Sequence, residues 1–258
     1  MISEPFSHSR LSVFEQCPCR YKLHYIDKVE VEEAVGIEAF TGSLVHESLE
    51  HLYETAREGQ VVGWNELASR LRNRWDELYD SSVFIVRKGS SPHDHLLRAQ
   101  NMLMAYYRAH QPFQEGSTVG LEHELRFRIS GKREHEMIGY VDRLTHLGDG
   151  VYEIHDYKTG KRIPSPTSMG KDRQLALYEI GVRRSFPGVR EVHLIWHYLA
   201  HDKQIRSHRT AEQLEELEAD TSVLIESIEE CVRFPRRQGP LCRWCEYHDM
   251  CGSLDEEE

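Results

Sequence analysis

The segment YEIHDYKTGKR, residues 152–162, brings an acid and a lysine to the end of an apolar strand. Asp156 and Lys158 are two positions apart, and side chains at i and i+2 of a strand point to the same face. A second acid, Asp142, lies in the preceding run, GYVDRL. Two carboxylates and an ammonium group could together bind a cation and stabilise negative charge on a substrate.

The position of Asp142 relative to Asp156 depends on the turn LGDG at 147–150, which is a strong hairpin signal. A three-residue loop at 148–150 places the two acids directly opposite each other, with Cβ atoms roughly 4.5–5.5 Å apart. Like charges at that distance destabilise a sheet unless a cation compensates them, and hard oxygen ligands suit Mg²⁺ or Mn²⁺. Geometry alone leaves an alternative, a solvated face on which Lys158 neutralises one acid.

The cysteines are the second group of residues with metal-binding chemistry. They are Cys17, Cys19, Cys231, Cys242, Cys245 and Cys251. In a cytosolic chain disulfides are a poor explanation, and close spacing indicates metal or cluster ligation instead. The run CRWCEYHDMC has Cys-x2-Cys-x5-Cys spacing and is one ligand short of four. A local zinc site is one interpretation, with ligands Cys242, Cys245, His248 and Cys251.

Length and composition limit the function classes. The chain has 258 residues, 39% hydrophobic and 29% charged, which is typical of a soluble protein. No apolar run approaches the ~18 residues of a membrane span, and the N-terminus lacks a signal-peptide pattern, so we expect a cytoplasmic protein with no membrane partner. A net charge of -11 argues against non-specific binding to nucleic acid. Basic residues nevertheless gather beside the acid–lysine strand and the cysteine run: Lys158, Lys161, Arg162, Lys171, Arg173, Arg233, Arg236, Arg237 and Arg243.

Hydrophobic periodicity and turn signals predict the elements that position these residues. Helices are expected at 7–26 with a break near Pro18, and at 43–57, 64–79, 93–110, 172–185 and 211–232. Strands are expected at 119–129, 135–147, 151–159, 190–200 and 203–209. The pattern indicates an α/β (α+β) fold, in which a sheet with mostly antiparallel early strands is flanked by helices.

GYVDRL followed by HDYKTG resembles the core signature of the PD-(D/E)XK nuclease superfamily, specifically its RecB-like exonuclease branch. GSLVHESLE at 42–50 is similar to the GxxxH helix motif of that branch, and QLALY at 174–178 is similar to its QxxxY motif. These motifs occur in the order of the family and, with the cysteines, extend over nearly the whole chain. The resemblance implies a restriction-endonuclease-like core, with a central mixed sheet flanked by helices, an additional helical region and a C-terminal iron–sulfur segment.

The resemblance also implies roles for the matching residues. Lys158 would position or activate the attacking water and stabilise charge on the phosphate. Gln174 and Tyr178 would contact the DNA strand near the scissile bond. The implied ligands of Mg²⁺ or Mn²⁺ are His46, Asp142, Asp156 and the backbone carbonyl of Tyr157.

One cysteine near the N-terminus and three near the C-terminus resemble the iron–sulfur staple of the AddB nuclease domain and of CRISPR-associated RecB-like exonucleases. The implied ligands of a [4Fe–4S] cluster are Cys17, Cys242, Cys245 and Cys251. Cys19 is an alternative to Cys17, which we prefer because it precedes Pro18, as in the family. The zinc interpretation would leave Cys17 without a role.

We therefore expect a single RecB-like nuclease domain over residues 1–258. Its parts are an N-terminal helix with the first cluster cysteine (1–41), a helical region with the motif histidine (42–115), the catalytic sheet core (116–210), and the C-terminal helix with the cysteine cluster (211–258).

The expected function is that of a metal-dependent DNA nuclease, specifically a single-stranded DNA exonuclease in DNA repair, recombination or CRISPR adaptation. It would be cytoplasmic, associated with the nucleoid, and could work with a helicase or a CRISPR integration partner. The alternative is a catalytically silent DNA-binding or scaffolding subunit of a nuclease–helicase complex. A redox sensor built around the cluster is a third hypothesis, but it would not need the two acids and the lysine.

Overall fold

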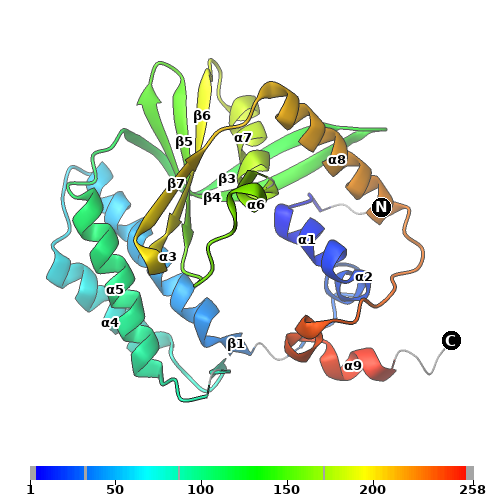
Figure 1. The fold of residues 1–258 in the computed structure, drawn as a ribbon, viewed down its shortest axis with the longest axis horizontal. Helices are drawn as coiled ribbons and strands as arrows, with labels where there is room; N and C mark the ends of the chain where they lie inside the picture. Colours follow the sequence, from blue (N-terminus) through cyan, green and yellow to red (C-terminus); the bar gives the residue numbers. More distant parts are fainter. Residues whose placement is uncertain (1–3, 32–33, 87, 171, 254–258) are drawn as a thin grey trace.

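The computed structural model describes residues 4–31, 34–86, 88–170 and 172–253, so Lys171 lies outside the described residues. At the centre, five strands form one sheet in the order β3-β4-β5-β6-β7 (Figure 1). The strands are β3 (Ser117–Ser130), β4 (Glu134–Gly148), β5 (Val151–Lys158), β6 (Glu191–Tyr198) and β7 (Lys203–Ser207). Strands β3 to β5 form an antiparallel meander, β5 and β6 are parallel, and β6 and β7 are antiparallel. The sheet is mixed and flanked by helices, which confirms the predicted fold class.

Helices cover both faces of this sheet (Figure 1). On one side lie α3 (Ile37–Arg57), α4 (Trp64–Leu78) and α5 (Pro92–His110). On the other side lie α1 (His8–Gln16), α7 (Arg173–Ser185) and α8 (Ala211–Glu229). The shorter segments are α2 (Pro18–Tyr21), η1 (Lys22–Ile26), β1 (Val35–Gly36), β2 (Val83–Phe84), α6 (Pro166–Gly170), η2 (Leu199–His201), η3 (Pro240–Trp244) and α9 (His248–Ser253). Within the described part of the chain, no helix is both long and apolar enough to cross a membrane.

Each face of the sheet has its own apolar core. On the side of α7 and α8, Ile154 and Leu194 pack in a cluster with Ile225, and all three side chains are fully buried. On the side of α3 to α5, Leu49 belongs to a second cluster that includes Tyr157. Strand β5 contributes to both clusters because alternate side chains of a strand point to opposite faces. The strand that carries Asp156 and Lys158 is therefore held from both sides.

The observed helices differ from the predicted ones at the start of α3 and agree with them at Pro18. Helix α3 begins at Ile37, six residues before its expected start, because Ile37, Phe40 and Leu44 form a buried stripe at helical spacing. The break predicted near Pro18 is confirmed, since Cys17 is extended and Pro18 begins α2. The segments α6, η3 and α9 were not predicted, because they are too short to show a hydrophobic period.

The β4–β5 hairpin has the predicted register. Its regular backbone pairs extend as far as Arg143 opposite His155. Asp142 and Asp156 are the next two positions along this register, so the sequence prediction that brings these acids together at one point of the sheet is confirmed.

The loop of this hairpin differs from the prediction. Gly148 pairs with Val151, so the turn has two residues, Asp149 and Gly150, rather than three. Both turn residues have positive φ, which suits a tight hairpin turn. Leu147 is the extra residue of a bulge, and this bulge restores the register that a three-residue loop would have given.

Helix α7 approaches β4 closely at Gly139. A Cβ atom at Gly139 would lie 2.3 Å from Cε1 and 2.8 Å from Cδ1 of Tyr178. Only a residue without a side chain leaves room for this ring. The glycine of GYVDRL therefore seats Tyr178, the aromatic residue of the QLALY motif, against the strand that carries Asp142.

Gly139→Ala should destabilise the protein by about 1–3 kcal/mol, because the added methyl group overpacks a buried contact and displaces the Tyr178 ring. Urea unfolding measures this change. Gly160→Ala is the matched control, because nothing lies within 4 Å of a Cβ atom at that exposed glycine. Equal stability of the two variants would contradict the close packing of α7 on β4.

Candidate functional site

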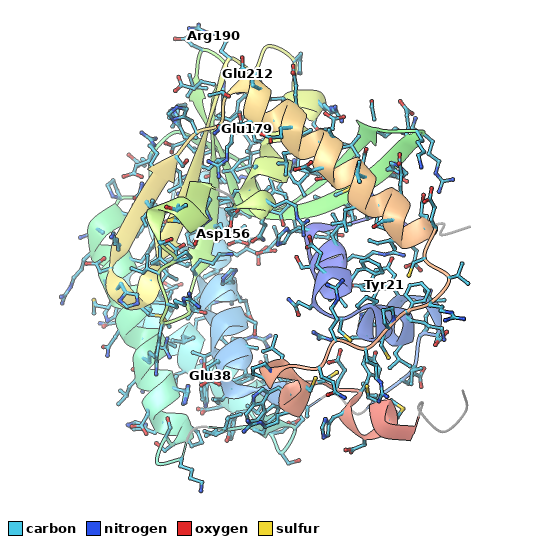
Figure 2. The ribbon with its side chains drawn as sticks, turned by 45° about the vertical axis from the view of Figure 1, so that its right-hand side comes forward. Tyr21, Glu38, Asp156, Glu179, Arg190 and Glu212 are labelled. Carbon is cyan, nitrogen blue, oxygen red and sulfur yellow. The ribbon has the colours of Figure 1, made fainter. Side chains whose placement is uncertain are left out.

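The residues expected to do chemistry lie at the C-terminal end of β5, between the two helical layers. They are His46 of α3, Asp142 of β4, Asp156 and Lys158 of β5, and Gln174 and Tyr178 of α7. Figure 2 shows Asp156 in the middle of the molecule. The structure thus brings together every residue of the three motifs that the sequence singled out.

The regular alternation of side chains between the two faces of β4 is interrupted near Asp142. Val141 and Leu144 both belong to the cluster on the side of α7 and α8, although regular alternation would put them on opposite faces. Arg143 points to the other side, toward α3. On β3, Glu122 lies across from Asp142 and has φ 42°, a left-handed conformation that is uncommon for residues with a side chain. The ladder is therefore irregular where the acids lie, and this irregularity lets groups from both helical layers reach them.

The backbone of Tyr157 connects Asp142 with His46. Its N–H donates to Asp142 Oδ2 at 2.7 Å, and its carbonyl oxygen lies 2.7 Å from His46 Nε2. Since the regular β4–β5 pairs end at Arg143, the carboxylate of Asp142 takes the place of a backbone acceptor. His46 Nδ1 lies 3.6 Å from the same carboxylate oxygen.

A second chain of contacts runs from Asp156 to helix α7. Lys158 Nζ lies 2.9 Å from Oδ1 and 2.8 Å from Oδ2 of Asp156. The same ammonium group donates to Gln174 Oε1 at 3.1 Å, and Gln174 Nε2 donates to the Tyr178 hydroxyl at 3.3 Å. The lysine is therefore held between an acid and an amide, both of which fix its direction.

Glu122 is a site residue that sequence reasoning missed. His46, Glu122 and Asp142 each place one ligand atom so that all three atoms lie within 4.8 Å of one another. The register of the β3–β4 hairpin could have indicated it. Leu121 pairs with Arg143 and His123 pairs with Val141, so Glu122 lies across from Asp142. The strands β3, β4 and β5 therefore align three acids, Glu122, Asp142 and Asp156, across the sheet.

Burial and mutual repulsion make these carboxylates weak acids. Burial, followed by the nearby charge of Asp156, raises the pKa of Asp142 to about 7. Burial also raises the pKa of Asp156, although Lys158 opposes the change, and it raises the pKa of Glu122 with a contribution from Asp142. Burial tends to lower the pKa of Lys158, but Asp156 outweighs it and the pKa is raised. Lys158 is therefore a cation at neutral pH, and the acids lack sufficient compensating charge.

The donor set fits a hard divalent cation. At metal–oxygen distances of roughly 2.0–2.2 Å, neighbouring ligands of an octahedral ion lie about 3 Å apart. The separation of 2.7 Å between His46 Nε2 and the Tyr157 oxygen is close to this value. Carboxylate oxygens, a carbonyl oxygen and one imidazole are ligands that suit Mg²⁺ or Mn²⁺.

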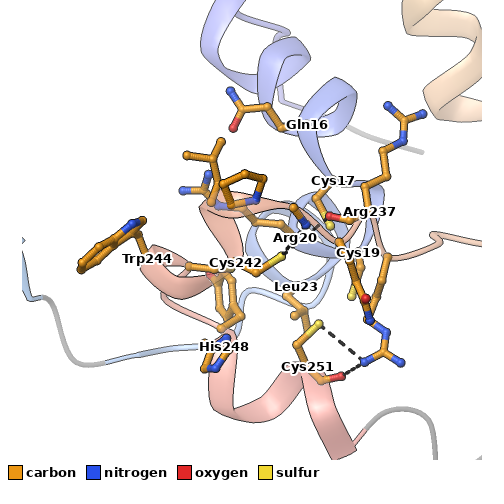
Figure 3. A pocket seen from close by; sticks show the side chains of 17 residues that line it. Gln16, Cys17, Cys19, Arg20, Leu23, Arg237, Cys242, Trp244, His248 and Cys251 are labelled. Atoms are coloured by element: carbon orange, nitrogen blue, oxygen red, sulfur yellow. Dashed lines mark hydrogen bonds between the residues drawn. The ribbon is translucent and has the colours of Figure 1, made fainter.

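The cysteines from the two ends of the chain line one cavity of about 980 Å³. Figure 3 shows Cys17, Cys19, Cys242 and Cys251 around this space. Cys245 lines the same cavity, whereas Cys231 does not. The two ends are joined directly, because Arg20 pairs with Glu246 at 3.0 Å.

The described cysteine and histidine side chains of this cavity do not form a ready zinc site. Thiolates that share one zinc ion at 2.3 Å lie about 3.8 Å apart. Within the described chain, no three of these side chains bring ligand atoms within 4.8 Å of one another.

Comparisons with known proteins bear on the fold and the family of this chain. A candidate exonuclease from Eubacterium rectale has a solved structure with a TM-score of 0.54 at 12% identity, covering 93% of this chain and 88% of that chain. At that identity the likeness concerns the fold alone. The solved structure of SSO0001 covers 95% of both chains at 12% identity, but its TM-score of 0.39 is too low to support an argument. No curated protein matches the sequence. Residues 5–252 match the model of the PD-(D/E)XK nuclease superfamily, and the chain belongs to that family.

Proposed function

We propose that this protein is a metal-dependent deoxyribonuclease that acts as an exonuclease on single-stranded DNA. The observation that carries the proposal is the junction of two sets of groups: the donors His46, Glu122 and Asp142, and the Asp156–Lys158 pair. Hydrolysis of a phosphodiester needs an activated water and positive charge near the developing oxyanion. The site offers residues for both tasks.

A divalent cation would be held by His46, Asp142, Asp156 and the Tyr157 carbonyl, with Glu122 as a further carboxylate on its β3 side. When bound, Mg²⁺ or Mn²⁺ would lower the pKa of a water molecule and polarise the phosphate. The His46 ligand favours Mn²⁺ relative to Mg²⁺, because imidazole is softer than carboxylate or water.

The chain's own residues would position the substrate and compensate its charge. Lys158, held by Asp156 and Gln174, would place its ammonium group beside the reacting phosphate and the attacking water. Gln174 and Tyr178 would contact the strand near the scissile bond, with the Tyr178 ring suited to base stacking. A single strand offers exposed bases for that contact, which supports single-stranded DNA as the substrate. Repair, recombination or CRISPR adaptation would each supply such strands.

We also propose that the cysteine cavity binds a [4Fe–4S] cluster through Cys17, Cys242, Cys245 and Cys251. Cys17 and Cys19 both line this cavity. We assign Cys17 as the N-terminal ligand because it directly precedes Pro18, as in the nucleases that this cysteine pattern resembles.

The cluster would also support the active site through helix α1. Glu15 lies two residues before Cys17 and accepts a hydrogen bond from Arg173 Nη1 at 3.1 Å. Arg173 is next to Gln174, which contacts Lys158. A cluster that fixes Cys17 would therefore help to fix the N-terminal end of α7, so we expect its role to be structural.

Asp156→Ala and Lys158→Ala should each reduce the cleavage rate by about 10²–10³-fold or more, because each removes charge from the reacting centre. The assay uses single- and double-stranded DNA labelled at the 5′ or 3′ end, with Mg²⁺, Mn²⁺ or excess chelator. Asp149→Asn, in the exposed turn of the same hairpin, is the control and should be fully active. Near-normal cleavage by Asp156→Ala would refute the nuclease assignment, and DNA binding without cleavage by the unmodified protein would favour the scaffolding alternative.

Mn²⁺ should raise the melting temperature more at pH 8 than at pH 5.5. In the metal-free fold the pKa of Asp142 is about 7, above its usual value near 4 in an unfolded chain, so the folded state binds the extra proton. The contribution of that proton to the free energy of unfolding is fully present below about pH 4, and it is lost as the pH rises through about 7. Mn²⁺ replaces the proton and restores the stability.

Differential scanning fluorimetry in chelator and in Mn²⁺, at both pH values, measures this dependence. Asp142→Asn removes the titrating group and should be more stable than the unmodified protein in chelator at pH 8. A Mn²⁺ shift that is equal at both pH values, or that persists in Asp142→Asn, would contradict the assignment.

Purified protein should be brown, absorb broadly near ~400 nm and contain iron rather than zinc. Cys17→Ser should lose the colour and melt at a lower temperature, whereas Cys231→Ser, outside the cavity, should keep both properties. Loss of colour in Cys19→Ser but not in Cys17→Ser would show that Cys19 is the ligand. Colourless protein with stoichiometric zinc would establish the local zinc site instead.

A further inference from the structure

Arg143 carries a charge into the interior of the protein without an acidic partner. Its side chain is completely buried, and none of the described acidic side chains forms an ion pair with it. Burying an unpaired guanidinium group is unfavourable unless its N–H groups are satisfied by hydrogen bonds. The N–H groups of Arg143 must therefore be satisfied by neutral acceptors.

Three neutral groups accept hydrogen bonds from the guanidinium. Nε donates to the Tyr157 hydroxyl, Nη1 to Thr145 Oγ1 and Nη2 to His155 Nδ1, each at 3.0 Å. The guanidinium also lies over the ring of Tyr53, 4.0 Å from its centroid, in a cation–π contact. Burial lowers the pKa of His155 well below its usual value, and Arg143 adds to the effect, so this imidazole is a neutral acceptor.

The contacts of Arg143 close into a ring of four side chains. The Tyr157 hydroxyl lies 3.3 Å from that of Tyr106, and the Tyr106 hydroxyl lies 2.7 Å from that of Tyr53. Tyr53 returns to Arg143 through its aromatic ring. This ring, Arg143–Tyr157–Tyr106–Tyr53, joins β4, β5, α5 and α3.

The ring adjoins the candidate metal site on three of the elements that supply its ligands, β4, β5 and α3. Arg143 follows Asp142 on β4. Tyr157 contributes its side chain to the ring, while its backbone contacts Asp142 and His46. Tyr53 lies seven residues after His46 on α3, and positions seven apart lie on the same face of a helix. The ring therefore fixes the helix that carries the histidine against the strands that carry the acids.

We propose that Arg143 is a positioning residue for the divalent cation, acting through Tyr157 and Tyr53 on the side of the sheet that α3 covers. The inference rests on the metal site proposed above. Arg143 holds the Tyr157 peptide and helix α3 at the separation that lets His46, Asp142 and the Tyr157 carbonyl face the same cation. It touches neither the cation nor the DNA.

The test measures Mn²⁺ affinity by isothermal titration calorimetry, together with the melting temperature in chelator. Arg143→Met keeps the approximate volume and removes the hydrogen bonds, and Tyr157→Phe removes only one hydroxyl group. Both should weaken Mn²⁺ binding, by about 10-fold or more for Arg143→Met, as expected for groups that orient metal ligands. Arg143→Lys keeps the charge but not the planar fork, and its affinity should lie between those of Arg143→Met and the unmodified protein.

The matched control is Tyr107→Phe. Tyr107 is also a buried tyrosine of α5, and its hydroxyl donates to the Val62 carbonyl at 2.8 Å, outside the ring. This variant should lower the melting temperature without changing the affinity for Mn²⁺. If Arg143→Met does not fold, Tyr157→Phe still carries the test.

The outcomes separate this inference from the proposed function. Unchanged Mn²⁺ affinity in Tyr157→Phe and Arg143→Met, with only a lower melting temperature, would overturn the positioning role and leave the metal site intact. Equal weakening in Tyr107→Phe would also overturn it, because the effect would then be general destabilisation. Absence of Mn²⁺ binding to the unmodified protein would overturn the metal site and this inference with it.

Discussion

The peptide of Tyr157 is the point on which the candidate site depends. Its N–H holds the carboxylate of Asp142, and its carbonyl faces His46, which comes from a helix on the other side of the site. A peptide within a buried central strand has little freedom, because neighbouring strands and side chains on both faces hold it. This rigidity lets one peptide set the separation of an acid and a histidine that are distant in the sequence. Asp156 and Lys158 have the same support, because both are paired with β6 on either side of Tyr157.

The electrostatics of the site follow from that arrangement. Three acids, Glu122, Asp142 and Asp156, are aligned across neighbouring strands. Among the described lysine and arginine side chains, only Lys158 forms an ion pair with one of them. A pKa of about 7 for Asp142 means that a proton supplies part of the missing charge in the metal-free protein. A site that holds a proton so close to neutrality can exchange it for a divalent cation at little cost. The same acids that make the empty site unfavourable thus make it a good cation site.

Strand periodicity and turn chemistry predicted much of this arrangement. The turn LGDG was enough to align Asp142 with Asp156, because the bulge at Leu147 and the two-residue turn give the same register as the expected loop. Glu122 was missed because its contribution depends on a second register and on a left-handed residue inside a strand, which breaks the alternation that strand predictions assume. His46 was found only through its motif, since one histidine on an amphipathic helix carries no signal of what it faces.

The support behind the site could not be predicted either. Arg143 reads in the sequence as one charged position between Asp142 and Leu144, and regular alternation from Val141 would have put it on the side of α7 and α8. Its burial follows from the change of side in β4, and its partners Tyr53 and Tyr106 come from helices whose packing the sequence does not specify. The cysteine pattern did predict that the two ends of the chain meet, and they do so at the cysteine cavity. No local pattern indicates the contact of His24 with Tyr247 that accompanies this meeting.

The most direct test of this account is an anomalous difference map from crystals of the protein soaked with Mn²⁺. We expect a peak at about 2.0–2.3 Å from the Asp142 carboxylate, the Tyr157 carbonyl and a ring nitrogen of His46, with Asp156 completing the oxygen ligands. The peak should disappear in Asp142→Asn crystals. Mn²⁺ bound only at sites away from these residues, or a peak unaffected by Asp142→Asn, would contradict the central claim that the irregular end of the β4–β5 ladder is a metal site.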